Sequence, residues 1–527
     1  MYLSKSLYTR GLQCVKSLWI KRYKKDVLTS PNSSAQAIFD TGNEVGELAC
    51  ELFPNGVEIE FDPNDYDGMI DTTKQLIKNG VQNIYEASFN YCGIFVAVDI
   101  LHTNDDNSVE IYEVKSSTSI KDIYKHDASI QYYVLKSLGY NVKKVSIVHI
   151  NNNYVRDEEL EINKLFTIVD VTDEVLQLQD EIPTHIKKFY KALSYIDREP
   201  KQDIGIHCSK PYDCDAFSYC WKHIPKYSIF DISRLRDKKK FELYNQGIIN
   251  FTDIEDISTF STAQQIQIES ELSQKEIINK DAIKEFVDSL SYPIYHLDFE
   301  TFQQAVPQWK GISPFMQIPF QYSIHKQEKD GSLKHFEFLA DENSDPRYEL
   351  AKKLVEDIPK DVTVLAYNMG FEKGVIRKLA SEFEEFSDHL MAIHENIQDL
   401  MIPFAKKHYY TPAMSGSYSI KYVLPALVPD MAKAYKDLDL VQNGGDAMQT
   451  FGKLSKMEDK DREAYREALL EYCKLDTLAM VRVLDKLKEK TNKGYVYFCN
   501  NCEHEFVFHE KLNELQCDNY SDMILKI

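Results

Sequence analysis

Short apolar runs separated by polar turns predict much of the regular structure in this chain, because such runs are typical of buried strands. Four runs are clearest, at residues 94–101, 109–115, 295–302 and 362–367. Apolar residues at helical spacing follow at 127–138 and 468–487. Strands and helices in two separate stretches of the chain favour a multidomain α/β protein.

The run at 295–302 carries two carboxylates, Asp298 and Glu300. Successive side chains of a strand alternate between its faces, so these two converge on one side while Leu297 and Phe299 enter the core. Two like charges so close repel each other unless a divalent ion lies between them or one of them takes up a proton. The pair therefore predicts a metal site, and it predicts further acids along the chain.

Two later segments supply such acids. Glu372 lies where the strand at 362–367 passes into a helix, and Tyr472 and Asp476 stack on one face of the helix at 468–487. In this order the residues resemble the motifs of the DnaQ-like 3′-5′ exonuclease family, which has the ribonuclease H fold. Those motifs are Asp-x-Glu, Asn-x-x-Phe-Asp and Tyr-x-x-x-Asp. Glu372 departs from the pattern, because the family has Asp at this position.

This resemblance implies hydrolysis of phosphodiester bonds with two bound ions of Mg²⁺ or Mn²⁺. Carried over residue by residue, the metal ligands are Asp298, Glu300, Glu372 and Asp476. Tyr472 would orient the attacking water rather than bind a metal.

The hairpin predicted at residues 94–115 carries a second set of charged residues. It brings Asp99 on the first strand beside Glu113 and Lys115 on the second. With Glu86 ahead of the hairpin and Gln131 in the following helix, the set resembles the core of the PD-(D/E)XK (restriction-endonuclease-like) nucleases, and their RecB type in particular.

The second resemblance implies a divalent ion held by Asp99, Glu113 and Glu86, with Lys115 orienting and helping to deprotonate the water. Gln131 would contact nucleic acid. Gly46 stands where RecB-type enzymes usually place a metal-binding histidine. Because of this departure two alternatives stay open, a second nuclease site or a domain that only grips DNA.

Four cysteines of the first half form a set, and we expect a helix over residues 1–25 to present the first of them. They are Cys14, Cys208, Cys214 and Cys220. The set resembles that of the iron-sulfur RecB-type nucleases, in which four thiolates bind a 4Fe-4S cluster. The usual late spacing is Cys-x2-Cys-x5-Cys, whereas both gaps here are of five residues. A four-cysteine Zn²⁺ site and buried cysteines without a ligand remain alternatives.

The motifs divide the chain into four predicted segments. These are a RecB-like PD-(D/E)XK domain at 1–225, a helical connector at 226–290, a DnaQ-like domain at 291–490 and a tail at 491–527. The tail resembles part of a zinc ribbon, with Cys499, Cys502 and Cys517, but Tyr520 stands where the fourth cysteine belongs. The order of the domains resembles an uncharacterised bacterial family of double nucleases.

The net charge of −21 argues against broad, charge-driven adhesion to nucleic acid or to anionic membranes. It does not exclude a nuclease, because metal ions in acidic pockets meet the phosphate directly. No apolar run of the sequence reaches membrane-spanning length, and basic residues interrupt the amino terminus before a signal-peptide core could form. We therefore expect a cytoplasmic protein.

Together the resemblances predict a metal-dependent nuclease that trims from a 3′ end, in repair or in defence against phages or plasmids. DNA is favoured over RNA by analogy with iron-sulfur RecB-type domains, and a helicase is the kind of protein partner expected. One alternative is a ribonuclease that uses the same DnaQ-like site. Another is a nucleic-acid-binding protein whose PD-(D/E)XK core is inactive.

Overall fold

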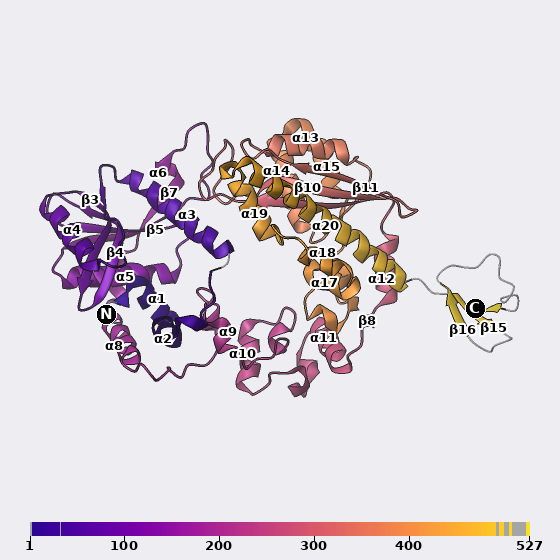
Figure 1. Cartoon of the computed structure of the whole chain (residues 1–527), viewed down its shortest axis with the longest axis horizontal. Coiled ribbons are helices and arrows are strands. Elements are labelled where there is room, and N and C mark those ends of the chain that lie inside the picture. The colour runs from indigo at the N-terminus through magenta and orange to yellow at the C-terminus, as the bar shows by residue number, and fades with distance from the viewer. Residues whose placement is uncertain (1–2, 32, 492–494, 500–504, 509–522, 527) are drawn as a thin grey trace. The chain divides into compact units, whose positions relative to one another are not determined.

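The computed structural model describes residues 3–31, 33–491, 495–499, 505–508 and 523–526. The chain forms two compact units, each with a sheet and helices of its own (Figure 1). The first unit comprises Met1–Lys226, Arg236–Gly247 and Phe302–Ile318, and the second comprises Tyr227–Leu235, Ile248–Thr301 and Pro319–Ile527. The predicted α/β multidomain class is confirmed. Within the predicted connector, helix α10 (Asp237–Asn245) belongs to the first unit.

Seven strands form the sheet of the first unit, in the order β2-β3-β4-β5-β6-β7 with β1 added alongside β4. They are β1 (Leu3–Ser4), β2 (Val57–Glu58), β3 (Asn83–Tyr91), β4 (Ile94–Thr103), β5 (Val109–Lys115), β6 (Val142–Ile150) and β7 (Phe166–Asp170). The predicted hairpin is the antiparallel pair β4 and β5. Helix α5 (Asp122–Ser137) connects β5 to β6, which run parallel.

Strands β4 and β5 part in the middle of β4. β5 pairs with β4 from Ile100 to Thr103, whereas β1 pairs with β4 in parallel at Ile94 and Phe95. Asp99 lies between the two paired stretches. Helix α1 (Lys5–Gln13) follows β1 directly, and the side chain of its first residue, Lys5, reaches Asp99.

The helix expected over residues 1–25 is in fact two helices, so this prediction is wrong in one respect. α1 ends and α2 (Val15–Tyr23) begins at Cys14, whose backbone is extended (φ −159°, ψ 115°). The physical reason is capping: the Cys14 sulfur accepts a hydrogen bond from the backbone N–H of Ser17 at 3.4 Å. A capping residue must leave helical geometry to make that bond.

Helices surround the first sheet. The longer ones besides α1, α2 and α5 are α3 (Ser33–Ala49), α4 (Tyr66–Lys78) and α8 (Ile182–Leu193). The apolar sides of α4 and α8 join those of the strands in one core, to which Ile84, Val96 and Val134 belong. Helix α3 contributes Val45 and Ala49 to a second core, with Ile100 and Val148 of the sheet.

Five strands form the main sheet of the second unit, in the order β11-β10-β9-β12-β13. They are β9 (Ile294–Phe302), β10 (Ile318–Gln327), β11 (Leu333–Leu339), β12 (Thr363–Ala366) and β13 (Ile397–Asp399). β12 runs parallel to β9 and to β13, and β11 runs antiparallel to β10. Leu297 and Phe299 of β9 enter the core as predicted.

The two faces of this sheet are covered differently. Helices α13 (Arg347–Asp357), α14 (Gly370–Glu382) and α15 (Glu384–Glu395) share an apolar core with it. The long helix α20 (Asp459–Thr491) bonds to the other face of β10 through polar side chains. Figure 1 shows α20 running along the sheet.

The tail contributes three short antiparallel strands, β15 (Tyr495–Cys499), β16 (Glu505–Phe508) and β17 (Met523–Lys526). Cys502 and Cys517 of the predicted zinc knuckle lie outside the described residues, and only the backbone of Cys499 is described. Among the helices that the structure describes, none is both long and apolar enough to cross a membrane.

Candidate metal centres

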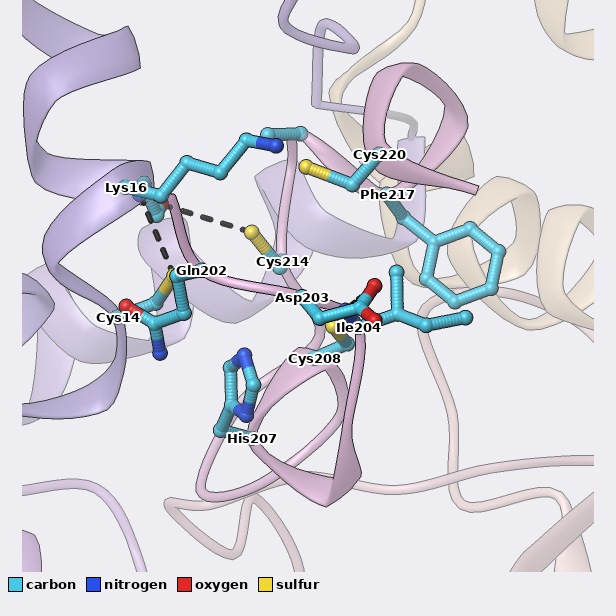
Figure 2. Close-up of a pocket in the computed structure, with 12 residues that line it drawn as sticks. Cys14, Lys16, Gln202, Asp203, Ile204, His207, Cys208, Cys214, Phe217 and Cys220 are labelled. Atoms are coloured by element: carbon cyan, nitrogen blue, oxygen red, sulfur yellow. Dashed lines mark hydrogen bonds between the residues drawn. The ribbon is translucent and has the colours of Figure 1, made fainter. Parts of the chain in front are cut away.

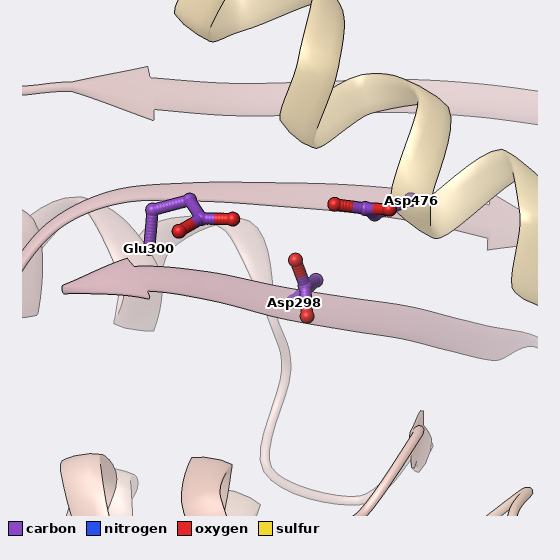
Figure 3. A group of neighbouring side chains, drawn as sticks. All are labelled: Asp298, Glu300 and Asp476. Atoms are coloured by element: carbon purple, nitrogen blue, oxygen red, sulfur yellow. The ribbon is translucent and has the colours of Figure 1, made fainter. Parts of the chain in front are cut away.

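Three carboxylates of the second unit meet at one point. Asp298 and Glu300 come from β9 and Asp476 from α20, and one ligand oxygen from each lies within 4.8 Å of the other two (Figure 3). We call this group the acidic triad. The predicted convergence of positions i and i+2 is observed. Helix α20 adds the third acid, Asp476, which lies 176 residues after Glu300 in the sequence.

No cation of the described chain neutralises the triad by an ion pair. Burial raises the pKa of all three: that of Glu300 to about 8, that of Asp476 to about 6, and that of Asp298 well above its ordinary value. Neighbouring acids add to the rise for Asp298 and Glu300. Lys421 acts on Glu300 and Asp476 only from beyond ion-pair distance. Buried oxygens of like charge without a counterion are the donor set that a hard divalent cation prefers. The residues present therefore fit Mg²⁺ or Mn²⁺.

Two tyrosines act on the carboxylate of Asp476. Tyr435 on α18 (Met431–Lys436) donates a hydrogen bond to its Oδ1 at 2.6 Å. Tyr472, one turn earlier in α20, also lowers the pKa of Asp476. The role expected of Tyr472 in orienting water stays a prediction. Tyr435 was not among the predicted site residues, because no motif spacing links it to Asp476.

Glu372 lies in the first turn of α14, as predicted, but it is not a member of the triad. Its side chain is buried, and burial raises its pKa to about 8. Its charge also raises the pKa of Asp298, so the two carboxylates lie near each other. Among the described residues, its Oε2 atom has no hydrogen-bond partner. A buried carboxylate oxygen of this kind is chemically suited to a divalent cation.

The turn that delivers Glu372 is held by Asp399 at the end of β13. One oxygen of Asp399 accepts hydrogen bonds from the backbone N–H groups of Asn368 and Met401, both at 2.9 Å. Asn368 has a positive φ of 72°, a strained conformation that this bond stabilises. Asp399 therefore acts through the backbone.

A row of buried polar residues joins β10 to α20, and we call it the polar seam. Gln321 donates to the carbonyl of Leu469 at 2.7 Å, Ser323 and His325 bond to the Thr477 hydroxyl at 2.8 and 2.7 Å, and Gln327 donates to Asp485 at 2.9 Å. These strand positions alternate, so they share one face. Hydrogen bonds are directional, so the seam fixes the register of α20 and with it the position of Asp476.

We expect Thr477→Val to destabilise the second unit. Valine has nearly the shape of threonine but leaves His325 Nδ1 buried without its partner, which costs about 1–3 kcal/mol. Thermal unfolding should show a Tm lower by a few degrees. Thr491→Val is the matched control, because that hydroxyl donates to the Lys488 carbonyl of its own helix and has no other hydrogen bond among the described residues. Equal losses in the two variants would contradict a role for the seam.

The metal-free protein should lose stability as pH rises. The folded pKa of Glu300 and Glu372 is about 8, above the ordinary 4.5, so the folded chain holds more protons than the unfolded chain between these values. The free energy of unfolding then falls by up to about 1.4 kcal/mol per pH unit for each acid. Urea unfolding in EDTA at pH 5.5, 7 and 8.5 measures this, and Glu300→Gln should show a shallower slope. Identical slopes would contradict the assignment.

The predicted residues of the first unit also come together. Lys115 Nζ lies 2.5 Å from Glu113 Oε1 and 2.8 Å from Asp127 Oδ2. Gln131 is fully buried and donates to Glu113 Oε2 at 2.6 Å. Its side chain therefore contacts an acid of the site and is not exposed to a nucleic acid in this structure. Lys5, which no motif indicated, donates to the same carboxylate.

Glu86 and Asp99 lie at the same site, on β3 and β4. Glu86 has a positive φ of 56°, and burial followed by the charge of Asp99 raises its pKa to about 7. Unlike the acidic triad, Glu86, Asp99 and Glu113 do not have ligand oxygens all within 4.8 Å of one another. Their expected role as one set of metal ligands stays a prediction.

The four predicted cysteines line one small cavity of the first unit, shown in Figure 2. Burial raises the pKa of Cys14, and it raises that of Cys220 to about 11. Within the described chain, no three of these sulfurs lie within 4.8 Å of one another. A tetrahedral Zn²⁺ with Zn–S bonds of about 2.3 Å would bring all four sulfurs closer than that.

Comparison with known proteins finds a family model and a relative that each match part of the chain. A family model described as a domain of unknown function (DUF2779) matches residues 295–419, which include Asp298, Glu300 and Glu372 but not Asp476. An uncharacterized protein of Ureaplasma parvum serovar 3 (strain ATCC 700970), UU173, is 25% identical over 338 residues, 59% of this chain and 47% of the relative. The chain thus spans about half the length of the relative. Neither name states an activity.

Proposed function

We propose that the protein is a divalent-metal-dependent nuclease whose second unit hydrolyses phosphodiester bonds from a 3′ end. The observation that carries this proposal is the acidic triad, in which a buried Glu300 and the half-buried Asp298 and Asp476 form no ion pair with a cation of the described chain. The order of its members along the chain is that of the DnaQ-like motifs. DNA is the favoured substrate, by analogy with the iron-sulfur RecB-type domains that the first half of the chain resembles.

The residues of the centre have two kinds of task in this proposal, metal binding and orientation of a ligand. Asp298, Glu300 and Asp476 would hold the ions, with Glu372 close by. When bound, Mg²⁺ or Mn²⁺ would supply Lewis-acid stabilisation of the charge that develops on the phosphate. Tyr435 would keep the Asp476 carboxylate in one orientation.

Lys421 is the basic residue best suited to contact the nucleic-acid backbone here. It lies on α17 (Ile420–Leu427), it is exposed, and its charge already acts on Glu300 and Asp476. A lysine in this position favours the approach of a phosphate toward carboxylates that would otherwise repel it.

The first unit would grip nucleic acid or act as a second nuclease. Its four cysteines would hold a 4Fe-4S cluster, with Zn²⁺ as the alternative. The separation of the sulfurs favours the cluster, because its four irons are bound by thiolates at separate corners rather than by thiolates around a single ion.

The test uses full-length protein purified without oxygen, Mn²⁺, and 5′-labelled single-stranded DNA and RNA of the same sequence. We expect a ladder of DNA products that shortens from the 3′ end and disappears in EDTA. Cleavage of RNA alone would favour the ribonuclease alternative. Binding of either substrate without cleavage would favour a nucleic-acid-binding protein and contradict the proposal.

A further inference from the structure

The acidic site of the first unit already contains a cation, the ammonium of Lys5. Its Nζ lies 2.9 Å from Asp99 Oδ1 and 3.2 Å from each oxygen of Glu113. Lys5 is the first residue of α1, and β1 places it where β4 and β5 part. The ammonium thus bridges the two carboxylates that the PD-(D/E)XK resemblance assigns to a divalent ion.

Every oxygen of these two carboxylates has a donor from the chain. Glu113 Oε1 accepts from Lys5 and Lys115, and Oε2 accepts from Lys5 and Gln131. Asp99 Oδ1 accepts from Lys5, and Oδ2 accepts from the backbone N–H of Val114 at 2.7 Å. A divalent ion takes its ligand oxygens at roughly 2.0–2.6 Å, which leaves no room for an ammonium between them.

The lysines act most strongly on Glu113, whereas burial and the charge of Glu113 raise the pKa of Asp99. Burial would raise the pKa of Glu113, but Lys115 and Lys5 overcome this and hold it well below the usual range. The acidic triad of the second unit has no such lysines among the described residues. The two acidic sites therefore differ in their direct ion pairs, because lysines contact Asp99 and Glu113 here and no cation of the described chain forms an ion pair with the triad.

We propose that Lys5 is a tethered competitor of the divalent ion, so that Mg²⁺ or Mn²⁺ enters the site of the first unit only by displacing the Lys5 ammonium. In this structure the site does not fit a metal. The long, flexible side chain of lysine can swing out from the start of α1 without unfolding the helix. The site is thus held closed to metal by the chain itself and opens when Lys5 leaves.

Contacts at the other end of α1 connect Lys5 to the cysteine segment. Arg10 forms a two-pronged ion pair with Asp215 at 2.7 and 3.0 Å, and Gln13 donates to the carbonyls of His207 and Tyr212 at 2.8 and 2.6 Å. Cys14, the next residue, lines the cysteine cavity. The position of Lys5 therefore depends on the segment that carries the three late cysteines.

The experiment is Mn²⁺ titration calorimetry on the full chain with Asp298→Asn, which disables the triad and makes the result independent of cleavage. Lys5→Met removes the ammonium and keeps the length of the side chain. We expect the Lys5→Met chain to bind one Mn²⁺ ion more than the chain with Lys5 over the same titration range. The affinity for Mn²⁺ at the site of the first unit should be at least about tenfold higher in Lys5→Met. Lys5→Arg should behave like the chain with Lys5, and so should Lys74→Met, which removes an exposed lysine paired with Asp71 in the same unit.

Equal Mn²⁺ stoichiometry and affinity with and without Lys5 would overturn the proposal. A second measurement does not require the Lys5 variants to fold: Glu113→Gln in the Asp298→Asn chain should leave the number of bound Mn²⁺ ions unchanged. Loss of an ion in that variant would show that Glu113 already holds a metal beside Lys5, and would also overturn the proposal.

Discussion

Asp298→Asn should lower nuclease activity by about 10³-fold or more. The substitution keeps the size of the side chain and removes the charge at the centre of the acidic triad, where each of the other acids interacts with it. A charge fixed where the transition state develops its own charge contributes several kcal/mol, and each 1.36 kcal/mol is tenfold in rate. The measurement is the rate of 3′ shortening of labelled single-stranded DNA in Mn²⁺.

The same variant separates a metal centre from a merely structural cluster. Mn²⁺ should raise the Tm of the wild-type protein, because an ion that binds only the folded state stabilises it, and this rise should be much smaller in Asp298→Asn. Asp288→Asn, an exposed acid of the same unit paired with Lys284, is the control and should keep both activity and the rise in Tm. Full activity in Asp298→Asn would refute the proposed centre.

The parts of this centre that the sequence predicted are those fixed by local geometry. Alternation along β9 puts Asp298 and Glu300 on one side, and helical spacing puts Tyr472 and Asp476 on one face of α20, whatever the rest of the fold. That these two elements meet was implied by the order of the motifs rather than by spacing. The hairpin that joins Asp99 to Glu113 is again a matter of local geometry, because a short polar turn predicts it directly.

Residues that reach a site from a distant element could not be predicted from local sequence patterns. Lys5 lies 94 residues from Asp99 along the chain, and its sequence neighbours suggest only the start of a helix. Tyr435 lies 41 residues before Asp476 on a short helix without a motif. The break of the first helix at Cys14 depends on a sulfur that caps α2, which apolar periodicity does not reveal. Long-range packing decides the positions of Lys5 and Tyr435, whereas a local cap decides the break at Cys14.

Cys208→Ser and Cys14→Ser should each remove most of the metal from the purified protein and destabilise the first unit. The cavity joins the junction of α1 and α2 to a loop segment nearly two hundred residues later, and a cluster that cross-links such distant points restricts the unfolded chain strongly. We expect a loss of several kcal/mol of unfolding free energy, because binding of a structural metal is itself folding energy. Metal analysis of anaerobically purified protein should give about four irons per wild-type chain.

Cys92→Ser is the matched control, since Cys92 is exposed and lies outside the cavity. It should keep both the iron and the Tm of wild type. One zinc and no iron in the wild-type protein would identify the alternative ion at the same four residues. If the wild-type protein contains no metal and Cys208→Ser has the same unfolding free energy as wild type, the four cysteines are core residues without a ligand. In that case α1 would owe its position to the Arg10–Asp215 pair and the Gln13 bonds alone, and Lys5 would have no link to a cofactor.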